Sequence, residues 1–177
     1  MQLFSRLLTT FGCLLLLCSV YLFFERINPN NLAFPAYGEE QAIITNDVSP
    51  QIISLPSIGK TLPILPSVIK GDSWETTSSG ISHLSSSPTP GEKGNSILYG
   101  HNWPNLLGDL RKVKPGETFT ITLSDGSIKS FTVAYVSVIS SANVAILEQS
   151  KDSRVTLYTC TGFLDSKRLV VTAILAK

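Results

Sequence analysis

The stretch RVTLYTCTGFLDSKRLVV, Arg154–Val171, predicts two β-strands joined by a short loop. Apolar and β-branched residues dominate both ends, and the more polar segment 161–167 separates them. Cys160 stands at the end of the first strand, and Arg168 stands at the start of the second. In an antiparallel hairpin, the returning strand begins beside the end of the strand before it. The sequence therefore predicts that Arg168 lies near Cys160.

The chain from Gln51 onward has the same β character, with short apolar runs interrupted by glycine and proline. The segment NSILYGH predicts a strand that ends at Gly100-His101, and segment 118–139 predicts a hairpin with its turn at Asp125-Gly126. The segment NVAILEQS predicts one short helical turn. Only segment 102–113 has apolar residues at helical spacing, and these are Trp103, Leu106, Leu107, Leu110 and Val113.

These elements add up to about eight short strands with one or two short helices and many turns, so we expect an all-β fold. Strands of this length and spacing favour a closed or nearly closed β-barrel over a sandwich.

The N-terminal segment Leu7–Phe24 is apolar and carries no charge, with Arg6 before it and Glu25-Arg26 after it. As a helix it would be roughly 27 Å long, which nearly matches a bilayer core of about 30 Å. A cleaved signal peptide is the alternative, but the apolar run is long for one and no clear cleavage site follows it. We therefore expect a membrane anchor over 1–26, with Arg6 favouring a cytoplasmic N-terminus.

An uncleaved anchor places nearly the whole chain outside the cell. Segment 27–50 is rich in Asn, Pro, Gly and acidic residues, which predicts an extracellular linker. The β-rich remainder, 51–177, is expected to form the folded domain.

The three cysteines divide between these parts. Cys13 and Cys18 lie in the membrane segment, where cysteine behaves as a small apolar residue. Cys160 is the single cysteine of the exported part, so that part forms no internal disulfide. Such a thiol could bond to a partner molecule, be a buried and inert side chain, or act as a reactive nucleophile.

A thiol nucleophile needs a group that takes its proton, and histidine is the usual one. The chain has two histidines, His83 and His101, and His101 follows a strand end as Cys160 does. Strand ends at one rim of a barrel can meet, and the forked donors of Arg168 suit an oxyanion or a substrate carbonyl. Taken singly, each residue also fits ordinary packing or a surface charge.

Two classes of function are disfavoured. The net charge is +1 and the basic residues are scattered, which argues against nucleic-acid binding. His83 and His101 are far apart in sequence and have no cluster of ligand residues around them, so we expect no metal site.

Several motifs together resemble the sortase family. TLYTC (Thr156–Cys160) resembles its Thr-Leu-x-Thr-Cys signature, and Arg168 follows at a similar interval. SPTPGEKGNSILYGHN (Ser87–Asn102) resembles the segment that carries the sortase histidine. GISHL (Gly80–Leu84) and LPILPSVIKG (Leu62–Gly71) resemble earlier parts of the domain, so the resemblance runs from about Gln51 to the end.

This resemblance implies an eight-stranded β-barrel and a cysteine transpeptidase without a cofactor. Sortases cut a Leu-Pro-x-Thr-Gly-like sorting signal of an exported protein, hold the acyl part as a thioester, and pass it to an amine on a cell-wall precursor or a pilin lysine. Carried over by residue, Cys160 is the nucleophile, His101 the general acid/base and Arg168 the oxyanion or substrate stabiliser. His83 and Thr159 have at most an auxiliary role. The compact form resembles the class D or class E groups.

Two alternatives fit the sequence less well. Other cysteine enzymes of the cell wall place the cysteine in a Ser-His-Gly-Cys setting or before the histidine in the chain, and this sequence does neither. A non-catalytic, membrane-tethered peptide-binding module needs no thiol, so the combination of Cys160, His101 and Arg168 favours the enzyme.

Overall fold

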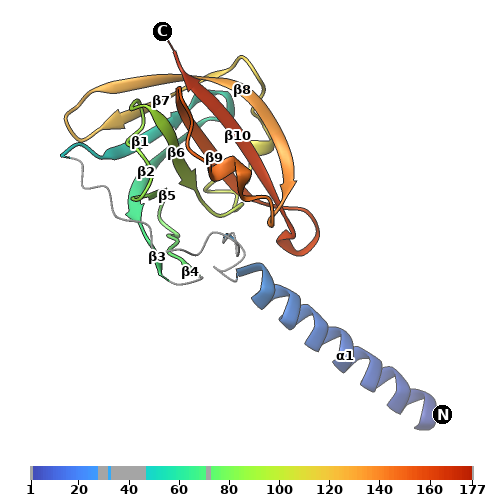
Figure 1. Ribbon diagram of the computed structural model, residues 1–177. Helices are drawn as coiled ribbons and strands as arrows, with labels where there is room; N and C mark the ends of the chain where they lie inside the picture. The colour runs from blue at the N-terminus through green and yellow to red at the C-terminus, as the bar shows by residue number, and fades with distance from the viewer. Residues whose placement is uncertain (1, 28–31, 33–46, 71–72, 177) are drawn as a thin grey trace.

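A computed structural model describes residues 2–27, 32, 47–70 and 73–176 (Figure 1). Eight strands form a closed barrel in the order β1-β2-β5-β6-β9-β10-β8-β7, which confirms the predicted fold class. Their bounds are β1 Pro50–Leu55, β2 Lys60–Ser67, β5 Ile81–Leu84, β6 Gly94–Tyr99, β7 Thr118–Leu123, β8 Ile128–Ser140, β9 Ser153–Thr161 and β10 Lys167–Leu175. A small separate sheet joins β3 (Ile69–Lys70) to β4 (Ser73–Trp74).

Two of the pairings in the barrel are parallel, β2 with β5 and β6 with β9, and the others are antiparallel. Parallel strands end at the same edge of a sheet. The pairing of β6 with β9 therefore brings two segments that are far apart in sequence to one rim of the barrel.

Both predicted hairpins are present. In the β7–β8 turn, Gly126 has a positive φ of 81° and the Ser127 amide donates to the Asp125 carboxylate at 2.9 Å. Strands β9 and β10 pair along their whole length, with Cys160 opposite Arg168. The predicted proximity of these two residues is thus a consequence of strand register.

The helix predicted over 102–113 is not regular. Four of its five apolar side chains are buried and that of Trp103 is half-buried, but the segment is a run of turns that ends in the 3₁₀ helix η3 (Leu110–Lys112). The Leu107 amide donates to the carbonyl of His101 and the Gly108 amide to that of Trp103, so both reach back further than the four residues of an α-helix. These bonds fold the segment tightly against the end of β6.

Gly108 is required by this tight packing. A Cβ at this position would lie 2.8 Å from the carbonyl oxygens of Asn102 and Trp103. The other 3₁₀ helices are η2 (Pro56–Ile58), η4 (Val144–Leu147) and η5 (Phe163–Asp165), and η4 confirms the short helical turn predicted there.

Apolar side chains form two separate clusters. The first fills the barrel and includes Leu98 of β6, Leu157 of β9 and Val171 of β10. The second covers the outer face of the same three strands and contains Tyr99, Tyr158, Cys160 and Val170. We call it the outer cluster, and its other buried members come from outside these strands or lie nearer the start of β6: Leu32, Trp74, Leu84, Ile97 and Leu147.

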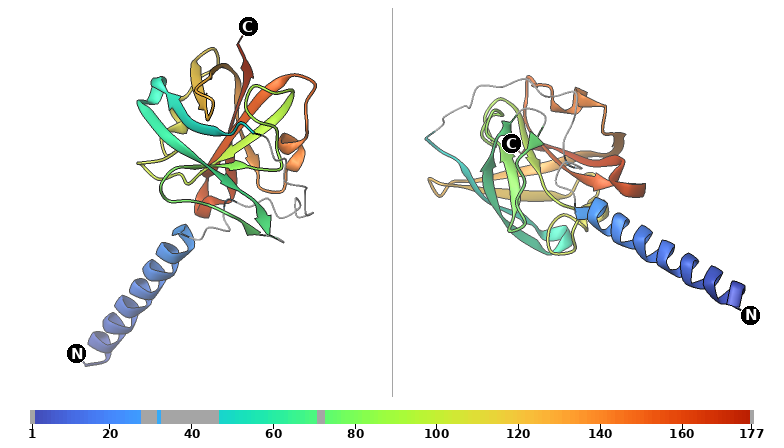
Figure 2. Two further views of the ribbon diagram at one scale, coloured as in Figure 1. Left: turned by 90° about the vertical axis from the view of Figure 1, so that its left-hand side faces the viewer. Right: turned by 90° about the horizontal axis from the view of Figure 1, so that it is seen from below.

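Helix α1 (Gln2–Ile27) projects away from one end of the barrel (Figures 1 and 2). Its segment Phe4–Glu25 is long and apolar enough to cross a membrane, and none of it is buried inside the protein. A signal sequence near the N-terminus can have the same length and composition. The linker expected over 27–50 lies largely outside the described residues.

Candidate active site

Strands β6, β9 and β10 bring Cys160, Arg168 and the segment that carries His101 to one end of the barrel. Cys160 pairs directly with Arg168 across β9 and β10. On the other side of β9, Tyr99 at the end of β6 pairs with Tyr158, and His101 follows two residues later, at the same end of these parallel strands as Cys160. Adjacent strands lie about 4.8 Å apart. Arg168 thus lies on the strand next to Cys160, and His101 lies in the segment that directly follows β6.

Thr159 fixes the segment that carries His101. Its hydroxyl donates to the carbonyl of Gly100 at 2.7 Å, and the Gly100 amide donates to the carbonyl of Tyr158 at 3.3 Å. These bonds continue the β6–β9 pairing beyond the end of β6. Thr159 itself is buried, and its hydrogen bond to Gly100 fixes the residue directly before His101.

The His101 imidazole stacks on the indole of Trp103, with ring centroids 4.3 Å apart and planes 8° from parallel. Burial lowers the pKa of His101 from its usual value near 6.5, because a charged ring loses hydration there, while the carboxylate of Asp165 acts in the opposite direction. At neutral pH the ring is therefore neutral and able to accept a proton.

Cys160 is buried at the end of β9. Burial raises the pKa of its thiol to about 12, and the charge of Arg168 opposes this shift while that of Asp165 adds to it. At neutral pH the resting protein thus holds Cys160 as a thiol and His101 as a neutral imidazole. Formation of a thiolate requires transfer of the proton to a nearby base.

Arg168 is also buried, with 3% of its surface exposed. Its Nη1 donates to the carbonyls of Asp165 at 2.9 Å and Lys167 at 3.1 Å. The same Asp165 accepts a hydrogen bond on its carboxylate from the Asn102 side chain at 3.0 Å. The β9–β10 loop is therefore linked both to the arginine and to the residue that follows the histidine.

His83 lies elsewhere. It pairs with Leu98, whose side chain belongs to the barrel core, so it is on the inward face while Cys160 is on the outward face. Its Nε2 lies 3.3 Å from the carbonyl of Pro88 and 3.3 Å from the hydroxyl of Ser87. Burial lowers the pKa of His83 to about 4.

A cavity of about 320 Å³ opens beside Cys160. The strand residues Thr159, Cys160, Thr161 and Leu169 line it on one side. Residues of the segment after His101 line the other side, and these are Asn102, Pro104, Gly108, Asp109 and Arg111. The cavity provides room for substrate atoms next to the sulfur. Among the described residues, no group of three His, Cys, Asp or Glu side chains is placed to hold a metal ion.

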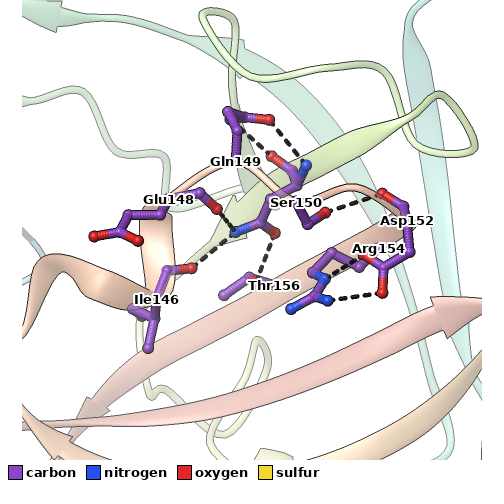
Figure 3. A network of polar contacts seen from close by, with 8 residues as sticks. Ile146, Glu148, Gln149, Ser150, Asp152, Arg154 and Thr156 are labelled. Atoms are coloured by element: carbon purple, nitrogen blue, oxygen red, sulfur yellow. Dashed lines mark hydrogen bonds and ion pairs between the residues drawn. The ribbon is translucent and has the colours of Figure 1, made fainter.

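A buried polar network holds the segment between β8 and β9 against the barrel (Figure 3). The Asn95 side chain donates to the carbonyls of Ile146 at 2.8 Å and Glu148 at 3.1 Å, and it accepts a hydrogen bond from Thr156 at 2.7 Å. This network sets the position of η4, whose Leu147 belongs to the outer cluster.

Sequence reasoning missed the roles of Trp103, Asn102 and Asp165 at the site. Trp103 has the spacing of a core residue and does pack against the barrel core, so its stacking on His101 gave no separate signal. The bond between Asn102 and Asp165 joins two loops and has no local sequence pattern.

Comparison with known proteins gives a consistent result. Residues 53–176 match the family model of the sortase domain. Sortase A of Listeria monocytogenes is 30% identical over 129 residues, which are 71% of this chain and 55% of that protein. The matched part thus spans about half the length of this curated relative.

Two solved structures have the same fold. Sortase A from Corynebacterium diphtheriae has a TM-score of 0.63 and 28% identity, covering 73% of this chain and 61% of that one. The pilus-related sortase C of Group B Streptococcus has a TM-score of 0.64 and 26% identity, covering 85% of this chain and 81% of that one. With its barrel closed in the same way and its family-model match extending over most of the chain, this protein belongs to the sortase family.

Proposed function

We propose that this protein is a membrane-anchored cysteine transpeptidase that cuts a Leu-Pro-x-Thr-Gly-like sorting signal and transfers the acyl part to an amine. The observation that carries the proposal is that Cys160 pairs with Arg168 across β9 and β10, while His101 follows β6, the strand on the other side of β9. A packing cysteine needs neither a neutral base on one side nor a fixed positive charge on the other.

In the first half of the reaction, the Cys160 proton passes to His101 as the sulfur attacks the scissile carbonyl carbon. The carbonyl oxygen becomes an oxyanion, and the guanidinium of Arg168 stabilises its charge. When the carbon–nitrogen bond breaks, the protonated His101 gives its proton to the departing amine. The product is a thioester between Cys160 and the acyl part of the signal.

In the second half, an acceptor amine attacks the thioester carbon and His101 takes a proton from this amine. Collapse of the intermediate expels the Cys160 sulfur, which recovers its proton from His101. A thioester conserves the energy of the acyl group, so that an amine can compete with water. We propose a cell-wall precursor or a pilin lysine as the source of that amine.

The proposed organisation of the chain has a membrane anchor at 1–26, an extracellular linker at 27–50 and the catalytic domain at 51–177. The N-terminus is cytoplasmic and the barrel is outside the cell in this arrangement. The apolar and uncovered surface of α1 supports the anchor. Intact-mass measurement of membrane-extracted protein should find the N-terminal residues retained, whereas a mature form that starts near Ala36 would indicate a cleaved signal.

The test is a peptide-cleavage assay with an added amine and a panel of signal peptides. Cys160→Ala should abolish turnover, and His101→Ala and Arg168→Ala should each lower kcat by about a hundredfold or more. Cys18→Ala is the control, because its thiol lies on α1 and takes no part in the chemistry. Mass spectrometry of trapped intermediate should find the acyl group on Cys160. Full turnover by Cys160→Ala would overturn the proposal, and peptide binding without any turnover would favour the binding module instead.

A further inference from the structure

The tip of the β9–β10 loop exposes two large apolar side chains next to the active site. Phe163 is 82% exposed, more than any other large apolar residue in the described part of the chain, and Leu164 is 44% exposed. Side chains of this kind on a soluble surface are an unfavourable arrangement unless they contact something else. Here they lie three to four positions after Cys160 in the sequence.

The backbone of this loop is held in an uncommon conformation that turns these side chains outward. Leu164 and Asp165 have positive φ angles of 50° and 57°, which are rare for residues other than glycine. The loop is fixed from inside by the bonds from Arg168 and Asn102 to Asp165. A strained conformation that persists in this way is typical of a functional segment.

The C-terminal end of α1 lies beside this loop. Cα atoms of α1 and η5 approach within 8 Å, and three views place the loop at the end of the barrel from which α1 projects (Figures 1 and 2). The segment of α1 suited to a membrane ends at Glu25, close to the end of the helix. A bilayer crossed by α1 would therefore have its surface at the level of η5.

The residues around the tip fit a membrane surface. Val138 on β8 is 56% exposed and pairs with Leu169, so it lies at the same rim of the barrel. Lys167 is exposed at the start of β10. An exposed aromatic ring, aliphatic side chains and a lysine together are typical of segments that lie in the interfacial region of a bilayer.

We propose that the β9–β10 loop inserts Phe163 and Leu164 into the interfacial region of the bilayer that α1 crosses. The inference rests on the proposed function, since it takes α1 as a membrane anchor. It goes further in assigning a lipid surface as the partner of the active-site loop. The inserted loop holds Cys160 close to the lipid surface, so that the enzyme acts best on a signal that continues into a membrane-embedded segment.

A protein or peptide partner would also cover an apolar tip, but the position of α1 favours lipid. A soluble partner gives no reason for the tip to lie at the membrane end of the barrel. Only a lipid surface accounts both for the exposed pair and for its place beside α1.

The first experiment measures insertion in the full-length protein reconstituted in phosphatidylcholine vesicles with brominated acyl chains. Phe163→Trp places a fluorophore at the tip, and Ile128→Trp is the matched control. Ile128 is 65% exposed and begins β8, far along that strand from Val138. After subtraction of the signal from Trp74 and Trp103, the Phe163→Trp emission should fall by at least half, whereas the Ile128→Trp emission should be unchanged.

The outcomes separate this inference from the proposed function. A chain that floats with the vesicles but shows equal quenching at both positions overturns the inserted loop alone. A chain that does not float with them overturns the anchor as well. Neither result depends on catalysis. The quenching experiment can therefore be interpreted even if other variants lose activity.

The second experiment measures the consequence for activity. The double variant Phe163→Ser, Leu164→Ser should lower turnover of a membrane-embedded substrate by about tenfold in vesicles and change turnover of a short soluble signal peptide by less than twofold. An equal loss on both substrates would assign the tip to peptide binding and overturn the role of lipid. No loss on either would overturn it too.

Discussion

The hydrogen bond from Thr159 to Gly100 should affect catalysis by holding His101 in position. Valine has nearly the shape of threonine but cannot donate, so Thr159→Val removes the 2.7 Å bond to the Gly100 carbonyl. We expect stability to fall by about 1 kcal/mol. We also expect kcat to fall by about tenfold with little change in KM, because His101 loses its fixed position.

The matched control is Thr156→Val on the same strand. Thr156 is equally buried and donates a bond of the same length, 2.7 Å, to Asn95, which is remote from His101. This variant should lose similar stability and keep its kcat. Urea unfolding and steady-state kinetics measure the two effects, and equal losses of kcat in both variants would show that Thr159 acts only through stability.

His83 should make the barrel sensitive to mild acid. Its pKa is about 4 in the folded state and 6.5 in an unfolded chain, so the unfolded state binds more protons between these values. The free energy of unfolding should therefore decrease as the pH falls from 6.5 towards 4, by up to about 3 kcal/mol. Urea unfolding at pH 7, 6 and 5 measures this decrease.

His83→Gln separates this effect from other titrations. The glutamine carries no titrating group, so the variant should be less stable at pH 7 but lose less stability between pH 7 and pH 5. His101 remains and contributes a slope in the same direction, because burial lowers its pKa too. If the variant kept the full slope of the parent, His83 would not be the source. Cleavage kinetics at pH 7 should change little, since His83 lies on the other face of the sheet from Cys160.

At the scale of elements, Asn95 determines where the segment between β8 and β9 lies. Asn95→Asp would direct a carboxylate at the carbonyls of Ile146 and Glu148, which now accept from its amide group. We expect a loss of about 3 kcal/mol, because a buried carboxylate oxygen would then face two carbonyl oxygens although the other oxygen keeps the bond from Thr156. Hydrogen exchange should become faster in segment 141–152, where η4 loses its attachment.

Asp152→Asn is the control for this substitution. Asp152 lies in the same segment and forms an ion pair with Arg154, but this pair is partly exposed and contributes less than about 1 kcal/mol. Exchange in segment 141–152 should remain close to that of the parent protein. Comparable protection in the Asn95→Asp and Asp152→Asn variants would show that the amide does not hold η4.

The elements that could be predicted from the sequence are those with local sequence patterns. The β7–β8 hairpin follows from alternation and the Asp-Gly turn, and the proximity of Arg168 to Cys160 follows from a short loop. Segment 102–113 has the apolar spacing of a helix, yet its amides bond to His101 and Trp103 in a different pattern. Spacing determined which side chains are buried there, but the tertiary contact with the end of β6 determined the backbone.

In the whole molecule, the position of the His101 segment beside β9 could not be predicted from periodicity. It depends on a parallel pairing of β6 with β9, and the β7–β8 hairpin separates these strands in sequence. No local pattern identifies parallel partners, so only the resemblance to a family placed the histidine with the cysteine. Barrel closure and the outer cluster depend in the same way on contacts between distant segments.

Substitution of Leu32 tests how much the N-terminal part of the chain contributes to the stability of the protein. It is completely buried in the outer cluster, and its carbonyl accepts a bond from the Tyr158 hydroxyl at 3.3 Å. The membrane segment of α1 buries nothing in the barrel. We therefore expect removal of residues 1–27 to leave the stability of the remainder unchanged, whereas Leu32→Ala should lower it by about 2 kcal/mol in either background.

Leu32→Ala should strengthen peptide binding although it lowers the stability of the protein. The outer cluster also contains Cys160, so a smaller residue 32 leaves apolar space that the leucine of a sorting signal can fill. We expect KM for signal peptides to fall severalfold while stability falls, and Leu32→Met, which keeps the volume, should change neither by much. Thermal unfolding and steady-state kinetics on the three proteins distinguish the cases. A higher KM in Leu32→Ala would mean that residue 32 supports the site rather than competing with the substrate for it.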